Sequence, residues 1–292
     1  MKKFYKKFFF IKIIFLSLFI VPFFYFNIPL KLIYKSKFYI NNFKISRLLK
    51  TNNCNIKTTT EIPKNSTIII GHLYGSPYTQ NDFIDKKAQE FLSNNKLKIK
   101  NLFLTGDIFH TPSKEKWDKL FTFLGDQMNI IIAPGNHDIG NLSSEKFFNS
   151  SIKQPNFFPL KYQDTNNIYI FENSIKSGWH IKENIFKNIN NINKSKNVIL
   201  LRHNIAVKEL ILLANSRDFL EKNLPDFKEL NSSLSREIII ISGDGGAFKH
   251  LPRVFCIKNG KVKYIINGLG GIKKDSILII NNNQILKYIF RT

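Results

Sequence analysis

The sequence predicts an α/β domain that follows a single N-terminal membrane-spanning helix. Five short apolar runs, rich in Ile, Leu and Val, alternate with segments of helical character. Such alternation is typical of a layered α/β domain. Residues 8–26 form a separate, longer apolar stretch. The chain has 292 residues, 43% of them hydrophobic, which is enough for one domain of about 200–250 residues with a buried core and an N-terminal extension.

The N-terminal stretch has the length and composition of a membrane anchor. Residues 8–26 are interrupted mainly by Lys12 and Ser17, and four lysines precede them. Nineteen residues at about 1.5 Å each nearly span a hydrocarbon core of about 30 Å. A cleaved secretory signal is the alternative, but no small-residue cleavage site follows Phe26. We therefore expect residues 1–30 to form an uncleaved, single-pass transmembrane anchor, a signal anchor.

The charge distribution leaves the orientation in the membrane open. The short basic N-terminal tail favours a cytoplasmic N-terminus, whereas the basic residues between 31 and 50 favour the opposite arrangement. Residues 31–65 are basic and then rich in Asn and Thr, so we interpret them as a linker. Residues 66–292 are expected to form the folded domain.

The net charge of +23 raises the question of a polyanionic partner. Residues 1–50 hold 11 of the 44 Lys and Arg residues and no acidic residue, so nearly half of the excess lies in the predicted anchor and linker. We interpret this charge as partly compositional and partly membrane-related, with nucleic acid as the less favoured partner. The sequence does not indicate an oligomeric state.

The two cysteines do not predict a metal site. Cys54 lies in a polar stretch and Cys256 in an apolar run, and their spacing fits no zinc motif. We interpret Cys256 as a small core residue and expect no disulfide framework.

The apolar runs after residue 65 are predicted as buried strands because turn residues bound them. They comprise 67–70, 102–104, 130–132, 198–201 and 238–241. Residues 81–97 and 113–124 are the helix candidates, and Ser113 is available as the N-cap of the second.

The C-terminal part is predicted to contain two hairpins. Asn259-Gly260 separates two apolar runs, which is a strong hairpin signal. The segment 281–284 separates another pair, 277–280 and 285–290. Residues 143–196 are rich in Asn and Lys, so we expect surface insertions there, with 168–171 as the one strand-like run.

Each of the five predicted strands is followed by residues that can bind a metal ion. These segments are Gly71-His72-Leu73-Tyr74-Gly75, Gly106-Asp107, Gly135-Asn136-His137-Asp138, His203-Asn204 and Gly243-Asp244-Gly245-Gly246. Ligands of open α/β sheets bind beyond the carboxyl ends of the strands, so these side chains are expected to converge. Clustered carboxylates repel one another unless a cation lies between them. Oxygen and imidazole donors without thiolate suit manganese, iron or zinc.

The order of these motifs resembles the calcineurin-like metallophosphoesterase family, whose pattern is DxH, GD, GNH[DE], a lone His and GHxH. Gly106-Asp107 matches the second motif, Gly135-Asn136-His137-Asp138 the third and His203 the fourth. The resemblance covers about residues 66–270. It implies a layered α/β/β/α sandwich and metal-dependent hydrolysis of a phosphate ester.

Two motifs depart from the family pattern. His72 and Tyr74 stand at the Asp and His positions of the first motif, and Asp244 and Gly246 at the two His positions of the last. The GHxYG and GDGG segments resemble a divergent bacterial branch of the superfamily. The resemblance implies one complete metal site, formed by Asp107, Asn136, His203 and Asp244. The other site keeps Asp107 and His72, so one or two divalent cations are expected.

The resemblance also implies roles for the third motif. His137 would protonate the leaving group and Asp138 would orient the His137 imidazole. His110 is expected at the rim of the crevice, and His250 is a candidate for a displaced ligand. Arg202 and Arg253 could meet a substrate phosphate, but solvation at the surface is the favoured interpretation.

We therefore expect a membrane-anchored phosphoesterase, a phosphatase or phosphodiesterase, that acts on a phosphorylated substrate of the envelope or the membrane. One alternative is a nuclease-like phosphodiesterase, which the positive charge after residue 50 would suit. The other is a non-catalytic metal-binding module with the same fold.

Overall fold

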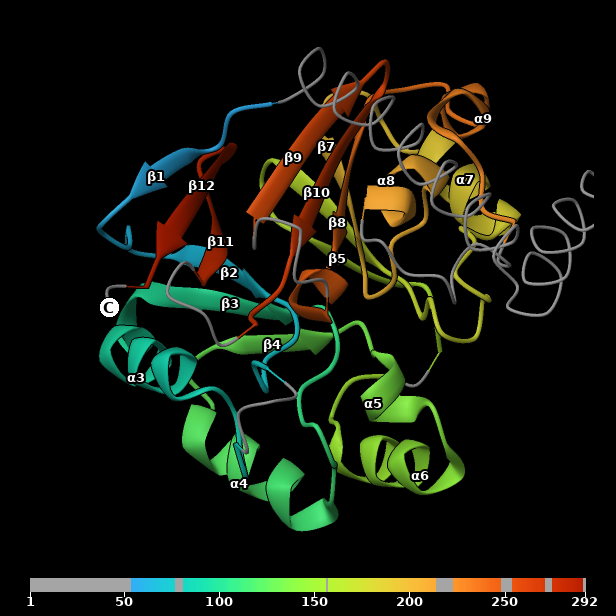
Figure 1. Cartoon of the computed structure of the whole chain (residues 1–292). Coiled ribbons are helices and arrows are strands. Elements are labelled where there is room, and N and C mark those ends of the chain that lie inside the picture. Colours follow the sequence, from blue (N-terminus) through green and yellow to red (C-terminus); the bar gives the residue numbers. More distant parts are fainter. Residues whose placement is uncertain are drawn as a thin grey trace, which may run out of the picture. The chain divides into compact units, whose positions relative to one another are not determined.

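Two six-stranded sheets form the centre of the computed structural model, which describes residues 54–76, 81–155, 157–213, 223–247, 254–270 and 275–290 (Figure 1). The first sheet has the order β1-β12-β11-β2-β3-β4. Its strands are Lys57–Thr59 (β1), Gln284–Ile289 (β12), Ser276–Asn281 (β11), Ser66–Ile70 (β2), Ile99–Leu104 (β3) and Asn129–Ile132 (β4). The second has the order β5-β6-β7-β8-β10-β9. Its strands are Leu160–Gln163 (β5), Asn167–Phe171 (β6), Asn197–Arg202 (β7), Ile238–Ser242 (β8), Val262–Asn267 (β10) and Val254–Asn259 (β9).

The first sheet is buried on both faces because its central strands are apolar throughout. In β3, Leu102 and Leu104 point into one hydrophobic cluster while Phe103 points into the other. The same alternation places Ile68 and Ile69 of β2 on opposite faces. The cluster that contains Phe103 also holds inward residues of the second sheet, so the two sheets pack face to face.

Helices flank the two sheets. The outer face of the first sheet packs against α3 (Lys86–Asn95), α4 (Lys114–Leu124) and α6 (Leu142–Ser151). Figure 1 places α7 (Glu183–Asn190), α8 (Lys208–Leu213) and α9 (Phe227–Ser232) beside the second sheet. The described residues thus form a mixed α/β fold with two sheets, consistent with the predicted sandwich.

Local sequence signals identified most of these elements. All five predicted core strands are present, and Ser113 caps α4, its side chain accepting a hydrogen bond from the Lys116 N–H. Both predicted hairpins form as antiparallel pairs, β9 with β10 and β11 with β12. The first helix is shorter than predicted, because the side chain of Asp85 caps its start.

The segment 143–196 is more regular than expected. It contains most of α6, strands β5 and β6, and all of α7. A high Asn content usually indicates irregular surface segments. Here several of the Asn side chains make specific contacts within a regular structure. The side chain of Asn190, for example, bonds both Ser233 and Ser235.

The folded domain begins before residue 66. Strand β1, within the predicted linker, pairs in parallel with β12. Cys54 forms a disulfide with Cys256 of β9. Cys256 is a buried core residue, as interpreted, but the sequence did not predict that its sulfur ties the start of the described chain to the second sheet. The predicted anchor at residues 1–30 lies outside the described residues. Among the described helices, none combines the length and apolar character that crossing a membrane requires.

Candidate metal centre

The loops after five strands bring the predicted metal donors together. In the first sheet, His72 follows β2, Asp107 follows β3, and Asn136 begins the short helix α5 (Asn136–Ile139) after β4. In the second sheet, His203 follows β7, and Asp244 begins the 3-10 turn η3 (Asp244–Ala247) after β8. Backbone hydrogen bonds join neighbouring loops, as between the His72 N–H and the Gly106 carbonyl at 2.9 Å.

The donor atoms of these residues lie within a few ångströms of one another. The Nε2 of His203 lies 3.5 Å from Asp107 Oδ1, 3.7 Å from Asp244 Oδ1 and 3.1 Å from Asn136 Oδ1. The Nε2 of His72 lies 3.7 Å from Asp107 Oδ2. One donor atom from each of His72, Asp107 and Asp244 fits within 4.8 Å of the others. All five predicted metal-ligating residues therefore converge.

Hydrogen bonds fix which ring nitrogen each histidine presents. The Nδ1 of His203 lies 3.0 Å from the Thr105 carbonyl, and the Nδ1 of His72 lies 2.7 Å from the Gly75 carbonyl. A carbonyl only accepts, so each Nδ1 carries the proton and each neutral ring presents an Nε2 lone pair to the centre. A carbonyl behind the imidazole is the usual support of a metal-ligating histidine.

The electrostatics of the centre suit a bound cation. Burial lowers the pKa of His72 to about 4, so its imidazole is neutral at pH 7. Burial raises the pKa of Asp244 to about 7. The pKa of Asp107 is lowered, because His203 and His72 outweigh the opposing effect of burial. Burial alone would lower the pKa of His203, but Asp107 and Asp244 raise it above its ordinary value. The raised pKa favours a proton on His203 in the absence of a cation, and a metal ion at the centre would compete with that proton.

The backbone at two donors is in the left-handed region. His72 has a φ of 53° and Asp107 a φ of 57°, values that non-glycine residues rarely adopt. Next to them, a side chain on Gly135 would overlap Asp107 Oδ1. Strain of this kind persists where the surroundings hold a functional group in place. Here the effect is to aim both side chains at the shared centre.

The structure assigns Asp138 a different contact from the one expected. Its carboxylate accepts hydrogen bonds from the N–H groups of Asp107 at 2.8 Å, Ile108 at 3.0 Å and Gly135 at 2.8 Å. Both oxygens are thereby committed to the backbone of two loops. The expectation that Asp138 orients the His137 ring was wrong in this respect, because the carboxylate instead joins the GD and GNHD loops.

The His137 ring is held by His110. The Nδ1 of His137 donates to the His110 carbonyl at 2.6 Å, which leaves Nε2 for contact with a substrate. The ring centroids of His110 and His137 lie 5.1 Å apart. His110 is exposed, in agreement with its expected place at the rim.

Tyr74 and Gly246 occupy the positions of the two missing family histidines. The Tyr74 side chain is 3% exposed, and its ring centroid lies 4.3 Å from that of His72 and 5.3 Å from that of His137. Burial, with Asp107 and Asp244, raises the Tyr74 pKa far above its ordinary value. The phenol therefore stays neutral. A Cβ on Gly246 would lie 2.5 Å from His72 Nδ1, so the imidazole packs directly against this glycine.

Arg202 stabilises the loop that carries His203. It is fully buried, contrary to the expectation of a solvated residue. Its guanidinium lies 3.0 Å from Glu172 Oε2 and donates to the carbonyls of Asn204 and Trp179. These contacts replace solvation. His250 and Arg253 lie outside the described residues.

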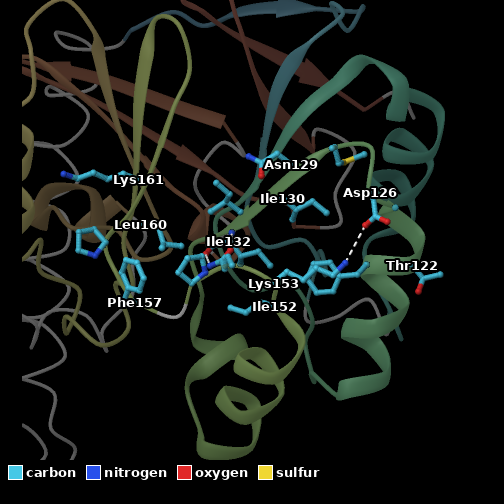
Figure 2. Close-up of a pocket in the computed structure, with 17 residues that line it drawn as sticks. Thr122, Asp126, Asn129, Ile130, Ile132, Ile152, Lys153, Phe157, Leu160 and Lys161 are labelled. Atoms are coloured by element: carbon cyan, nitrogen blue, oxygen red, sulfur yellow. Dashed lines mark hydrogen bonds and ion pairs between the residues drawn. The ribbon is translucent and has the colours of Figure 1, made fainter.

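One cavity among the described residues lies away from the metal donors. Figure 2 shows this hollow of about 960 Å³, which is lined by Ile130, Ile132, Ile152 and Phe157, among others, beside strands β4 and β5. None of the five donor residues lines it. The Gln154 side chain bonds both backbone groups of Ile132 there and covers the edge of β4. The candidate metal centre is therefore identified by its donor groups rather than by a cavity.

The comparison with known families agrees with this geometry. The profile of the calcineurin-like phosphoesterases matches residues 66–268, which is well over half of the chain. The chain belongs to the calcineurin-like phosphoesterase family. No curated protein matches its sequence. One solved structure that aligns with it is a phosphopantetheinyl hydrolase from Mycobacterium tuberculosis. The two share 10% sequence identity and a TM-score of 0.43, over 72% of this chain and 92% of that chain.

Within this calcineurin-like phosphoesterase, sequence motifs found the donors but missed their supports. The carbonyls of Thr105 and Gly75, which fix the two histidines, belong to the backbone and leave no residue-type signal. For the Arg202–Glu172 ion pair, the sequence points only to the basic partner, because Arg202 directly precedes His203. Its acidic partner, Glu172, directly follows strand β6 and could not be paired from spacing alone.

Proposed function

We propose that this protein hydrolyses a phosphate ester with the help of one or two divalent cations bound by His72, Asp107, Asn136, His203 and Asp244. The observation that carries the proposal is the convergence of two Nε2 lone pairs and two buried carboxylates on one point. A divalent cation at such a site neutralises phosphoryl oxygens and lowers the pKa of water at the centre. Manganese, iron and zinc all suit this donor set.

His137 supplies the proton for the leaving group in this proposal. Its Nδ1–H is committed to the His110 carbonyl, so Nε2 is the atom that donates. Asp107 contributes by fixing the start of α5, since its Oδ1 accepts the His137 backbone N–H at 3.0 Å. His137, which donates the proton, and Asp107, which binds the cation, are therefore held together.

A metal-reconstitution assay tests the proposal. The full-length chain, purified in detergent and stripped with a chelator, is supplied with Mn²⁺, Fe²⁺ or Zn²⁺ and assayed on aryl and bis(aryl) phosphates. We expect hydrolysis that requires the metal and is abolished by Asp107→Ala. Asp118→Ala, at an exposed carboxylate of α4, is the matched control and should leave the rate unchanged. Full metal-dependent activity in Asp107→Ala would remove the central assignment.

The role of His137 has its own test. In His137→Gln, the loss of kcat/KM should be small for a 4-nitrophenyl ester, whose leaving group needs little protonation, and large for an alkyl ester. A difference of about 10²–10³-fold between the two substrates is expected, given the usual contribution of general acids. Equal losses on both substrates would assign His137 to positioning instead.

An envelope or membrane-linked substrate is the finer part of the proposal. It is supported by the apolar stretch at residues 8–26 and by the Cys54–Cys256 disulfide, since such bonds persist mainly in oxidising compartments. The apolar stretch favours a membrane location, and the disulfide favours a domain outside the cytoplasm. In membrane vesicles of known sidedness, Cys54 and Cys256 should react with a maleimide only after reduction, and protease should reach the domain from the outward side. Free thiols or inward exposure would contradict this location.

A nuclease-like phosphodiesterase is the second candidate, favoured by the excess of basic residues after residue 50. Single-stranded DNA in the same assay separates the two, because a nuclease should cleave it faster than bis(aryl) phosphate. If the loaded protein binds metal and hydrolyses none of these esters, it is a binding module.

A further inference from the structure

We propose that a basic surface at one end of the second sheet docks the domain onto an anionic lipid bilayer. The surface surrounds a hollow of about 420 Å³ at the N-terminal ends of β7 and β8, beside the turn between β9 and β10. The metal donors follow the opposite ends of β7 and β8, so this surface is distinct from the candidate metal centre. The basic surface comprises Lys194, Lys196, Arg236, Lys258, Lys261 and Lys263.

Little negative charge offsets the basic surface. Among the described residues that line the hollow, Glu237 is the one carboxylate, and it lies 3.4 Å from Lys258. Both side chains are exposed, so this ion pair contributes little. Lys261 donates instead to the Leu234 carbonyl, which leaves its positive charge in place. The excess charge at this end of the sheet is therefore available to an anionic partner.

Two of these lysines face each other across the β9–β10 hairpin. Lys258 and Lys263 are directly paired, and like charges in that arrangement destabilise a sheet. Lys263 is half-buried, and its burial together with the charge of Lys258 lowers its pKa below the ordinary value for lysine. The pair thus costs folding free energy, which anionic groups against this surface would offset.

Arg236 holds the loop that carries two further lysines. Its guanidinium donates to the carbonyls of Ile192, Asn193 and Lys196. These bonds fix the backbone on both sides of Lys194. Basic groups from three separate segments of the chain are thereby kept around one hollow.

The composition of the hollow favours a bilayer over a nucleic acid. None of the described residues that line it is aromatic. Proteins that bind single-stranded nucleic acid combine basic grooves with aromatic side chains on which the bases stack. Exposed lysines without such rings, as at Lys194, Lys258 and Lys261, suit the headgroups of anionic lipids.

The chain also enters the domain beside the basic surface. Cys54, the first described residue, is bonded to Cys256 of β9 through its sulfur and its backbone N–H. Cys256 precedes Lys258 by two positions on the same strand. In the sequence, residues 27–53 connect Cys54 to the apolar stretch at residues 8–26. An anchor in that stretch would keep the basic surface within reach of the bilayer.

Docking through the basic surface would direct the metal centre away from the bilayer. His203 and Asp244 follow the ends of β7 and β8 that are opposite to the basic surface. Within the proposed function, on which this one consequence rests, the orientation favours a phosphorylated substrate of the envelope over a lipid of the same bilayer.

Lysine labelling of the wild-type, full-length chain tests the docking. The protein is reconstituted into nanodiscs of phosphatidylcholine, alone or with about 30% phosphatidylglycerol, and treated with an amine-reactive reagent. Mass spectrometry gives the labelling rate of each lysine. We expect phosphatidylglycerol to lower the rates at Lys258 and Lys261 by about fivefold or more, and about 0.5 M NaCl to restore them. Lys114, exposed on α4, should keep its rate. Equal labelling of Lys258 and Lys261 in the two lipids would overturn the inference.

Removal of charge tests which residues dock. In the triple variant Lys194→Gln/Lys258→Gln/Lys261→Gln, phosphatidylglycerol should no longer protect Lys263, because each lysine near an anionic surface contributes roughly fivefold to the association. The matched control, Lys114→Gln/Lys146→Gln/Lys153→Gln, removes three exposed lysines elsewhere and should keep the protection. Protection that persists in the first variant, or is lost in the control, would contradict the assignment of this surface.

Two further outcomes separate this inference from its alternatives. Protection of the basic surface by an oligonucleotide, without protection by phosphatidylglycerol, would overturn the inference in favour of nucleic acid. Hydrolysis of aryl phosphates is measured on the same samples. A protected basic surface without hydrolysis would refute the proposed function alone, and an active protein with an unprotected surface would refute this inference alone.

Discussion

The imidazole of His72 packs against the Cα of Gly246, in the space that a side chain at that position would need. A Cβ on Gly246 would lie 2.5 Å from His72 Nδ1 and would overlap the Leu269 carbonyl oxygen. The Leu269 backbone is anchored by its N–H, which donates to the Gly71 carbonyl at 3.0 Å. A side chain at position 246 would therefore displace both this backbone and the His72 ring, so the direction of the ring toward Asp107 depends on glycine at this position.

Gly246→Ala should weaken metal binding. The added methyl group displaces the His72 ring from the Gly75 carbonyl, and loss of such support typically costs about 10–100-fold in metal affinity. Competition with a chelating dye measures the dissociation constant. Gly125→Ala is the control, because a Cβ there meets nothing within 4 Å. It should lower stability by about 1 kcal/mol through its positive φ and leave metal affinity unchanged. A folded Gly246→Ala protein with normal affinity would exclude His72 as a ligand.

Asp138→Asn should destabilise the fold rather than only change the orientation of the His137 ring. The carboxylate accepts three backbone N–H groups with two oxygens, and an amide would place an N–H₂ group against at least one of them. We expect a loss of about 2–3 kcal/mol in the free energy of unfolding, as for other buried charged hydrogen bonds. Urea denaturation of the metal-free protein measures it, with exposed Asp118→Asn as the control. A loss below about 0.5 kcal/mol, the range of ordinary surface substitutions, would contradict this role.

Sequence reasoning succeeded where the signal is local. The strand-like runs, the Ser113 cap and the Asn259-Gly260 turn each depend on residues close in the chain, and the structure has all three. Because parallel strands end at one edge of a sheet, the convergence of His72 and Asp107, which follow the neighbouring strands β2 and β3, could also be expected.

It failed where the relationship exists only in space. The carboxylate of Asp138 could be recognised as a family motif, but its partners depend on how two loops meet. The pairing of Cys54 with Cys256 spans 202 residues and joins a segment that was interpreted as a linker. The exclusion between His72 and a side chain at position 246 likewise requires the coordinates.

Metal affinity should fall as the pH falls below about 7. Burial raises the pKa of Asp244 to about 7 in the metal-free protein, with His203 lowering and Asp107 raising it. Below that pH a cation must displace a proton, which costs about tenfold in affinity per pH unit for each proton released. Titrations with Mn²⁺ at pH 6, 7 and 8 test this. Asp244→Asn should bind more weakly at pH 8 and show a flatter dependence between pH 6 and 7.

The raised pKa of Asp244 also predicts how the stabilisation of the fold by metal depends on pH. The folded pKa of Asp244 lies above its ordinary value of 3.8, so the metal-free protein loses stability from this group as the pH rises toward 7. A cation removes the penalty of the buried charge. The rise in Tm on adding Mn²⁺ should therefore be larger at pH 8 than at pH 6, and the reverse order would contradict a protonated Asp244 in the metal-free state.

Reduction of the Cys54–Cys256 disulfide should lower the stability of the domain. The bond closes a loop of 202 residues and joins the chain before β1 to β9, so its loss frees the unfolded chain far more than the native one. We expect the free energy of unfolding to drop by about 2–5 kcal/mol, the usual cost of removing a native disulfide. Urea denaturation with and without dithiothreitol measures the change. The Cys54→Ala/Cys256→Ala double variant is the control, since it should show the reduced stability under both conditions. If dithiothreitol reduces the bond, as thiol titration would show, and leaves the wild-type transition in place, the disulfide contributes nothing to stability.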